Sequence, residues 1–158
     1  METLSLPLHP LLVHAAVTAI PVAAIAAICF VLVPSWRWAL RWPTTVVSII
    51  AAVTLFVTRQ TGEQLAAAGE EGERLIEIHQ QWANFLTVST IGLVGLVLLA
   101  WWILPVQSPL ASGRGAVAGR YAKFHLVLVV LVILAAVATI VFTVLTGHSG
   151  AVAVWTGE

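Results

Sequence analysis

Four long apolar stretches, almost free of charge, dominate this chain of 158 residues. A helix needs about 20 mostly apolar residues to cross the hydrocarbon core of a bilayer. Residues 11–33, 39–58, 80–104 and 124–147 meet that requirement, and Arg41 is the only charged residue within them. Only 9% of all residues are charged, against about 25% in a soluble domain. The sequence therefore predicts an all-α integral membrane four-helix bundle, a single domain over residues 1–158 in the lipid bilayer.

The charges are divided between the two sides of the predicted membrane. The connections after the first and third stretches, together with the start of the second stretch, carry five of the seven cations and no acid: Arg37, Arg41, Arg114, Arg120 and Lys123. The middle connection and the two ends carry all seven acids. Because cytoplasmic connections are enriched in Lys and Arg, both termini are predicted on the outer (periplasmic/extracytoplasmic) side. The first span lacks preceding basic residues, so we expect it to be retained rather than cleaved as a signal peptide.

The middle connection has its own helical pattern. Leu65, Ala68, Gly72, Leu75 and His79 recur at three- and four-residue steps, while the glutamates mostly lie off this stripe. We predict an outer amphipathic segment over residues 63–79 that leads into the third span. Its glutamates are interpreted as a solvated face rather than an ion site.

Histidines supply the main functional signal. Four of the five are placed at the outer ends of the predicted helices: His9, His14, His79 and His148. Ionisable residues at membrane depth are functional candidates, and imidazole is the commonest side-chain metal ligand. His125 lies at the inner end without a histidine partner, so a relay of two haems across the membrane is not expected.

Two kinds of bound group suit these histidines. A b-type haem needs one or two axial histidines on facing helices, for which we predict His14 and His79. Arg59 would meet its propionates, and Asn84 would orient a histidine. Alternatively, His9, His14, His79 and His148 would converge on a zinc or copper ion. In a third interpretation the histidines are structural, and the chain is a non-catalytic accessory or scaffold subunit.

Several function classes lack the residues they need. Net charge is zero, which gives no reason to expect a nucleic-acid partner. The chain has no aspartate and no nucleophile, nucleotide-binding or zinc-protease motif. We therefore expect an electron carrier or accessory protein, able to form homo-oligomers, rather than a hydrolase or transferase.

The two ends of the chain carry recognisable motifs. Residues 8–14 read Leu-His-Pro-Leu-Leu-Val-His, and residues 146–150 read Thr-Gly-His-Ser-Gly. With Thr61-Gly62, and with His79 and Asn84, they resemble a bacterial membrane family catalogued as domain of unknown function 2231. The resemblance implies a four-helix, multi-pass protein of the bacterial inner (cytoplasmic) membrane. Its relatives are sometimes joined to Rieske-type or cytochrome modules, which implies a redox partner or a respiratory-type membrane complex and favours haem over zinc.

Overall fold

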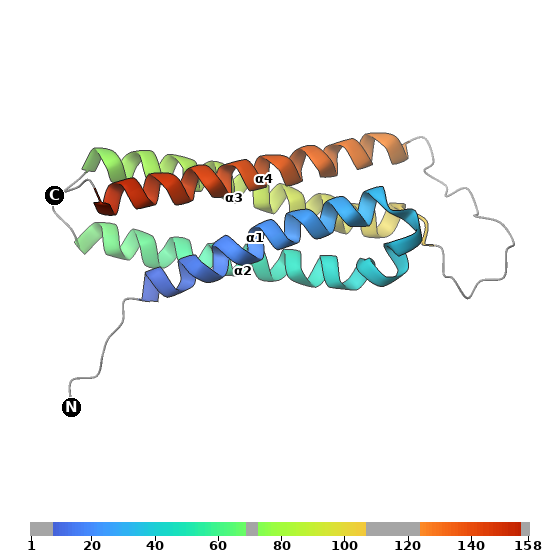
Figure 1. The fold of residues 1–158 in the computed structure, drawn as a ribbon, viewed down its shortest axis with the longest axis horizontal. Coiled ribbons are helices and arrows are strands. Elements are labelled where there is room, and N and C mark those ends of the chain that lie inside the picture. Colours follow the sequence, from blue (N-terminus) through green and yellow to red (C-terminus); the bar gives the residue numbers. More distant parts are fainter. Residues whose placement is uncertain (1–7, 69–72, 107–123, 156–158) are drawn as a thin grey trace, which may run out of the picture.

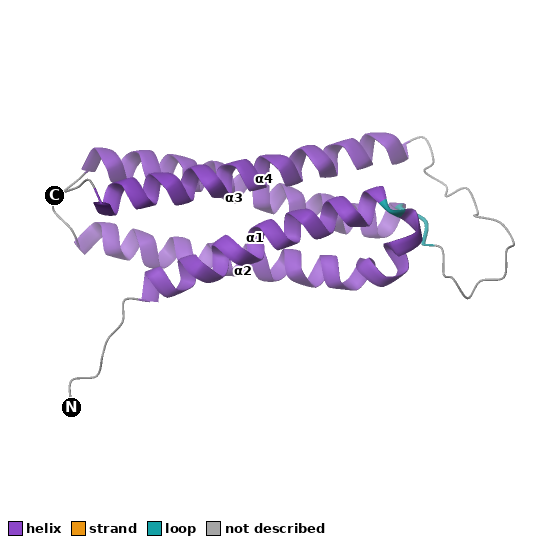
Figure 2. Cartoon of the chain, in the orientation of Figure 1, coloured by secondary structure: helices purple, strands orange, loops and turns teal. Residues whose placement is uncertain are grey.

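Four long helices make up nearly all of the described chain. The computed structural model describes residues 8–68, 73–106 and 124–155 (Figure 1). The helices are α1 (Leu8–Leu32), α2 (Arg37–Ala68), α3 (Glu73–Ile103) and α4 (His125–Trp155), and a 3₁₀ turn, η1 (Pro34–Trp36), precedes α2. The rest of the described chain is short loop segments (Figure 2). The predicted all-helical, four-helix architecture is confirmed.

Every helix contains a stretch long and apolar enough to cross a membrane. These stretches are Leu11–Leu32, Pro34–Gln64, Arg74–Ile103 and His125–Ala153. Exposed apolar side chains such as Val88 and Leu126 cover the outward faces, as expected for helices surrounded by lipid. The orientation of the termini relative to the two sides of a membrane stays a prediction.

The helices extend beyond the predicted spans on one side. α2 continues to Ala68 and α3 already begins at Glu73. The predicted amphipathic segment 63–79 is thus divided between the end of α2 and the start of α3, and its residues 69–72 lie outside the described chain.

The bundle consists of two helical hairpins. α1 packs most extensively on α2, and α3 on α4; α1 also packs on α4 and α2 on α3, whereas α1 and α3 barely touch. α1 and α3 begin at the same end of the bundle, where α2 and α4 finish (Figure 1). We call this the histidine end, and the opposite end, which includes Arg37, Arg41 and His125, the arginine end.

The second hairpin repeats the burial pattern of the first. When the sequence of α3 is aligned with that of α1 so that His79 matches His9, buried residues of the two helices coincide: Ala16 with Leu86, Ile20 with Thr90, Ala23 with Leu93, Ala27 with Val97 and Phe30 with Ala100. A second shift aligns α2 with α4: Thr44 with Val132, Ser48 with Ala136, Ala51 with Thr139 and Leu55 with Thr143. With the matching helix contacts, this pattern indicates an internal repeat about an approximate two-fold axis along the bundle.

Arg37 closes the arginine end. Arg37 is only 2% exposed. Its guanidinium donates hydrogen bonds to the carbonyls of Phe30 at 3.2 Å and Val31 at 2.7 Å. These carbonyls belong to the last turn of α1, which has no intrahelical donors and carries the negative end of the helix dipole. Arg37 Nη2 also lies 3.3 Å from His125 Nε2. Arg37 and His125 occupy corresponding positions of the repeat, so the two hairpins meet here across the axis.

Candidate functional site

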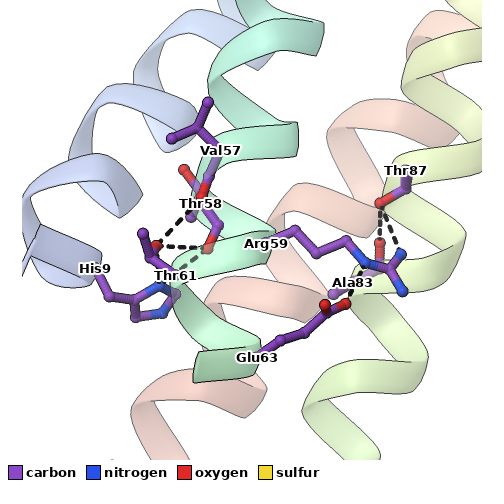
Figure 3. Close-up of polar contacts among 8 residues, drawn as sticks. All are labelled: His9, Val57, Thr58, Arg59, Thr61, Glu63, Ala83 and Thr87. Carbon is purple, nitrogen blue, oxygen red and sulfur yellow. Dashed lines mark hydrogen bonds and ion pairs between the residues drawn. The ribbon is translucent and has the colours of Figure 1, made fainter. Parts of the chain in front are cut away.

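His9 lies in the first turn of α1 and binds the end of α2. Its Nδ1 is 3.1 Å from the carbonyl oxygen of Thr58 and 3.2 Å from Oγ1 of Thr61 (Figure 3). The Thr61 hydroxyl itself lies 2.9 Å from the same carbonyl, to which it donates. We call this arrangement the His9 clasp.

His79 makes the corresponding contacts in the second hairpin. Its Nδ1 is 3.0 Å from the carbonyl oxygen of Thr146 and 3.2 Å from Oγ of Ser149. Ser149 Oγ lies 3.0 Å from the Thr146 carbonyl. Thr146 and Ser149 correspond to Thr58 and Thr61 of the repeat, so this His79 clasp repeats the contacts that the imidazole makes in the His9 clasp.

The acceptors at Nδ1 determine which ring nitrogen carries the proton. A carbonyl oxygen only accepts hydrogen bonds, and each clasp hydroxyl donates its own hydrogen to a carbonyl: Ser149 to Thr146, and Thr61 to Thr58 at 2.9 Å, with Val57 as a further acceptor at 3.3 Å. Nδ1 of His9 and of His79 must therefore be the protonated nitrogen in the neutral ring. The lone pair is left on Nε2 of each ring. Metal-bound histidines commonly have this arrangement, in which a backbone carbonyl holds one nitrogen and the other is a ligand.

A glycine makes room for each ring. A Cβ atom on Gly62 would lie 2.8 Å from Cε1 of His9, and one on Gly150 would lie 3.0 Å from Cε1 of His79. A Cβ on Gly62 would force the His9 ring to move, whereas a Cβ on Gly150 would require the His79 ring to shift by only a few tenths of an ångström. The glycine that follows each clasp hydroxyl therefore leaves room for the ring, most strictly at Gly62.

Alanine at either clasp glycine should displace a histidine ring and destabilise the protein. We expect Gly62→Ala to cost about 1–3 kcal/mol, the usual range for overpacking, and Gly150→Ala to cost less, because its Cβ contact is longer. Gly92→Ala is the matched control, because a Cβ there meets nothing within 4 Å and alanine favours the helix by about 1 kcal/mol over glycine. Thermal unfolding in detergent measures the difference. Clasp variants as stable as Gly92→Ala would contradict the role assigned to these glycines.

The two clasps lie at the same end of the bundle. A positive charge on His9 would act on His79 across the bundle. Both rings are partly buried, whereas His14 and His148 are exposed. The structure thus pairs His79 with His9 by the internal repeat, and the position corresponding to His14 is Asn84, which is also exposed.

Arg59 lies between the hairpins at the histidine end. Its Nε forms an ion pair with Glu63 at 2.9 Å, and Nη1 lies 3.5 Å from Oγ1 of Thr87 on α3 (Figure 3). Thr87 in turn donates to the carbonyl of Ala83. The Arg59 side chain is 37% exposed, so its remaining N–H groups are available to an acidic group.

The structure does not gather the four predicted metal ligands into one cluster. Among the residues it describes, no three His, Cys, Asp or Glu side chains lie together as a metal would need. The described geometry offers two equivalent imidazoles instead of three or four converging ones.

The clasp partners were missed by sequence reasoning, although a signal exists. The pattern Thr-x-x-(Thr/Ser)-Gly occurs at residues 58–62 and again at 146–150. A histidine near the start of the preceding helix accompanies each copy. The motifs at Thr61-Gly62 and 146–150 carry part of the resemblance stated above, but only the fold shows that each one receives an imidazole.

The comparisons with known proteins add no relative. No family model matches the chain, and no curated protein or solved structure matches it either. The resemblance to the bacterial membrane family therefore stays a prediction carried by its motifs.

Proposed function

We propose that this protein is a small multi-pass protein of the bacterial inner membrane that binds b-type haem at its histidine end and passes electrons near the outer face. The observation that carries the proposal is the pair of equivalent clasps, each of which leaves Nε2 of a histidine as a ligand. A haem takes two imidazoles on facing helices, and a two-fold arrangement of two hairpins would bring one imidazole to each side of the axis.

The residues of the site suit this group. His79 is the predicted axial ligand that the clasp geometry favours, and His9 replaces His14 as its best-supported partner. A backbone carbonyl holds Nδ1 of each ring, and such a contact raises the basicity of the ligating nitrogen. Arg59 offers a cation at the same end for a propionate. A bound haem supplies a one-electron couple.

The chain's own contribution is to hold and orient. The carbonyls of Thr58 and Thr146 fix the two rings, so little side-chain freedom is lost when a ligand is bound. Apolar residues line the bundle below the clasps, including Ala16 and Leu86, and exclude water from that side. The acids Glu63 and Glu77, both exposed, leave the rim of this end hydrated for an encounter with a redox partner.

A visible absorption spectrum of the protein purified from haem-supplied cells tests the proposal. We expect a Soret band, with α and β bands that sharpen on reduction. A colourless preparation that contains zinc or copper by elemental analysis would instead favour a metal-binding protein. A preparation without haem or metal that copurifies as a stable larger complex would favour an accessory or scaffold subunit with structural histidines.

A further inference from the structure

The arginine end has cations without carboxylates to neutralise them. The sequence has no acid between residues 3 and 62 or between 78 and 157. The described acids, Glu63, Glu73 and Glu77, all belong to the opposite end, where α2 finishes and α3 begins. Arg37 donates to two helix carbonyls, whereas Arg41 has one carbonyl acceptor within the described residues. No described carboxylate lies at this end to act as a counter-charge for Arg41.

Arg41 is held rigidly at the rim between α2 and α3. Its Nη2 donates to the carbonyl of Trp101 at 2.9 Å, and its Cζ lies 3.6 Å from the centroid of the Trp101 ring. A guanidinium has five N–H donors. Within the described chain Arg41 makes this one hydrogen bond, and its Nε is buried without a hydrogen-bond partner. The group is thus oriented by protein and left with donors for a further acceptor.

Two further indole rings pack on Trp101. Trp42 packs edge-on against Trp101 with ring centroids 5.5 Å apart, and Trp102 also packs edge-on against Trp101 at 5.5 Å. Trp42 is 64% exposed and Trp102 is 78% exposed. Tryptophans of this kind lie at the level of lipid headgroups. We call Arg41, Trp42, Trp101 and Trp102 the Arg41–tryptophan cluster.

The internal repeat shows that helix packing does not require this cluster. At the corresponding interface between α4 and α1, Val129 stands in place of Arg41 and Val31 in place of Trp101. Val31 is only 2% exposed, so that interface closes with two small apolar residues. The cluster is therefore a departure from the repeat that serves something other than joining two helices.

We propose that the Arg41–tryptophan cluster binds the headgroup of one anionic phospholipid per chain. A guanidinium matches two oxygens of a phosphodiester, basic sites between membrane helices bind anionic headgroups, and the exposed indoles cover the adjoining glycerol and upper acyl chains. Because the repeat does not duplicate the cluster, the site is single.

Native mass spectrometry of the full chain, with phosphatidylglycerol or phosphatidylcholine added in detergent, tests this proposal. We expect one retained phosphatidylglycerol, at least about tenfold weaker retention of phosphatidylcholine, and no competition from soluble glycerol phosphate, which lacks the acyl chains. Arg41→Gln should weaken retention about tenfold, an order-of-magnitude expectation for losing one charge-assisted contact. Arg59→Gln, at the opposite end, is the matched control and should retain the lipid.

A second variant guards against misfolding of Arg41→Gln. Trp102→Ala removes an exposed ring and should also weaken retention while leaving thermal stability in detergent unchanged. Equal retention of both lipids, equal loss in Arg59→Gln, or full retention in Arg41→Gln would overturn the proposal. Competition by glycerol phosphate would reassign the site to a free phosphate ester.

Discussion

Haem-loaded protein should lose most of its bound haem when either His9 or His79 is replaced by alanine. Each substitution removes one Nε2 ligand, and we expect the haem-to-protein ratio to fall more than about tenfold. Even mutation of a residue that only hydrogen-bonds to a ligand lowers the affinity for a metal about 10–100-fold. Absorbance at the Soret band, normalised to protein concentration, measures the ratio. The loss of protein stability in these two variants should be modest, because an interhelical hydrogen bond in a membrane contributes about 0.6–1.7 kcal/mol.

His14→Ala is the informative control for that experiment. The sequence predicts His14 and His79 as the axial pair, whereas the clasps favour His9 and His79. If His9 is the ligand, His14→Ala and His148→Ala retain an unchanged spectrum. Loss of haem in His14→Ala together with retention in His9→Ala would restore the original pair and leave the His9 clasp a purely structural contact.

Arg37→Met should be the most destabilising single substitution at the arginine end. Methionine keeps much of the side-chain volume but leaves the carbonyls of Phe30 and Val31 buried without donors, and it removes the contact with His125. Each unsatisfied buried group costs about 1–3 kcal/mol, so we expect a loss of about 2–4 kcal/mol in the free energy of unfolding. Chemical denaturation in mixed detergent micelles measures it.

Arg59→Met provides the comparison at the histidine end. Arg59 forms a partly exposed ion pair with Glu63, and pairs of this kind contribute about 0–1 kcal/mol. The loss of stability in Arg37→Lys should lie between those of Arg37→Met and Arg59→Met. A lysine ammonium keeps the charge, but it lacks the planar fork with which the guanidinium binds two carbonyls at once. Equal stability of Arg37→Met and Arg59→Met would contradict the capping role of Arg37.

The number of helices was predictable from the sequence because a bilayer imposes a minimum apolar length. The ends of the helices outside that apolar zone were not predictable from the sequence. α2 extends to Ala68 beyond the predicted end at residue 58, since no lipid boundary limits it there and the residues between favour a helix. The cations of the short connection were read as markers of orientation, yet Arg37 proves to be buried and to cap α1.

The candidate site was only partly predictable. The sequence placed His9 and His79 in one layer, but it gave no reason to prefer His9 to His14. The decisive contacts join an imidazole to backbone carbonyls of Thr58 and Thr146, and a carbonyl carries no residue signature. The repeat of whole hairpins was hidden for a related reason: the repeat preserves burial and the clasps, while most corresponding core residues differ in type, as Ile20 and Thr90 do.

Low-temperature electron paramagnetic resonance of the oxidised protein, purified from haem-supplied cells, tests the twin-clasp site most directly. Two neutral imidazoles bound through Nε2 predict a low-spin ferric signal in the wild-type protein, converted to high spin or lost in His9→Ala and in His79→Ala. A wild-type preparation that holds no haem, or that shows only high-spin ferric iron, would contradict the proposal that these two histidines share one ligand.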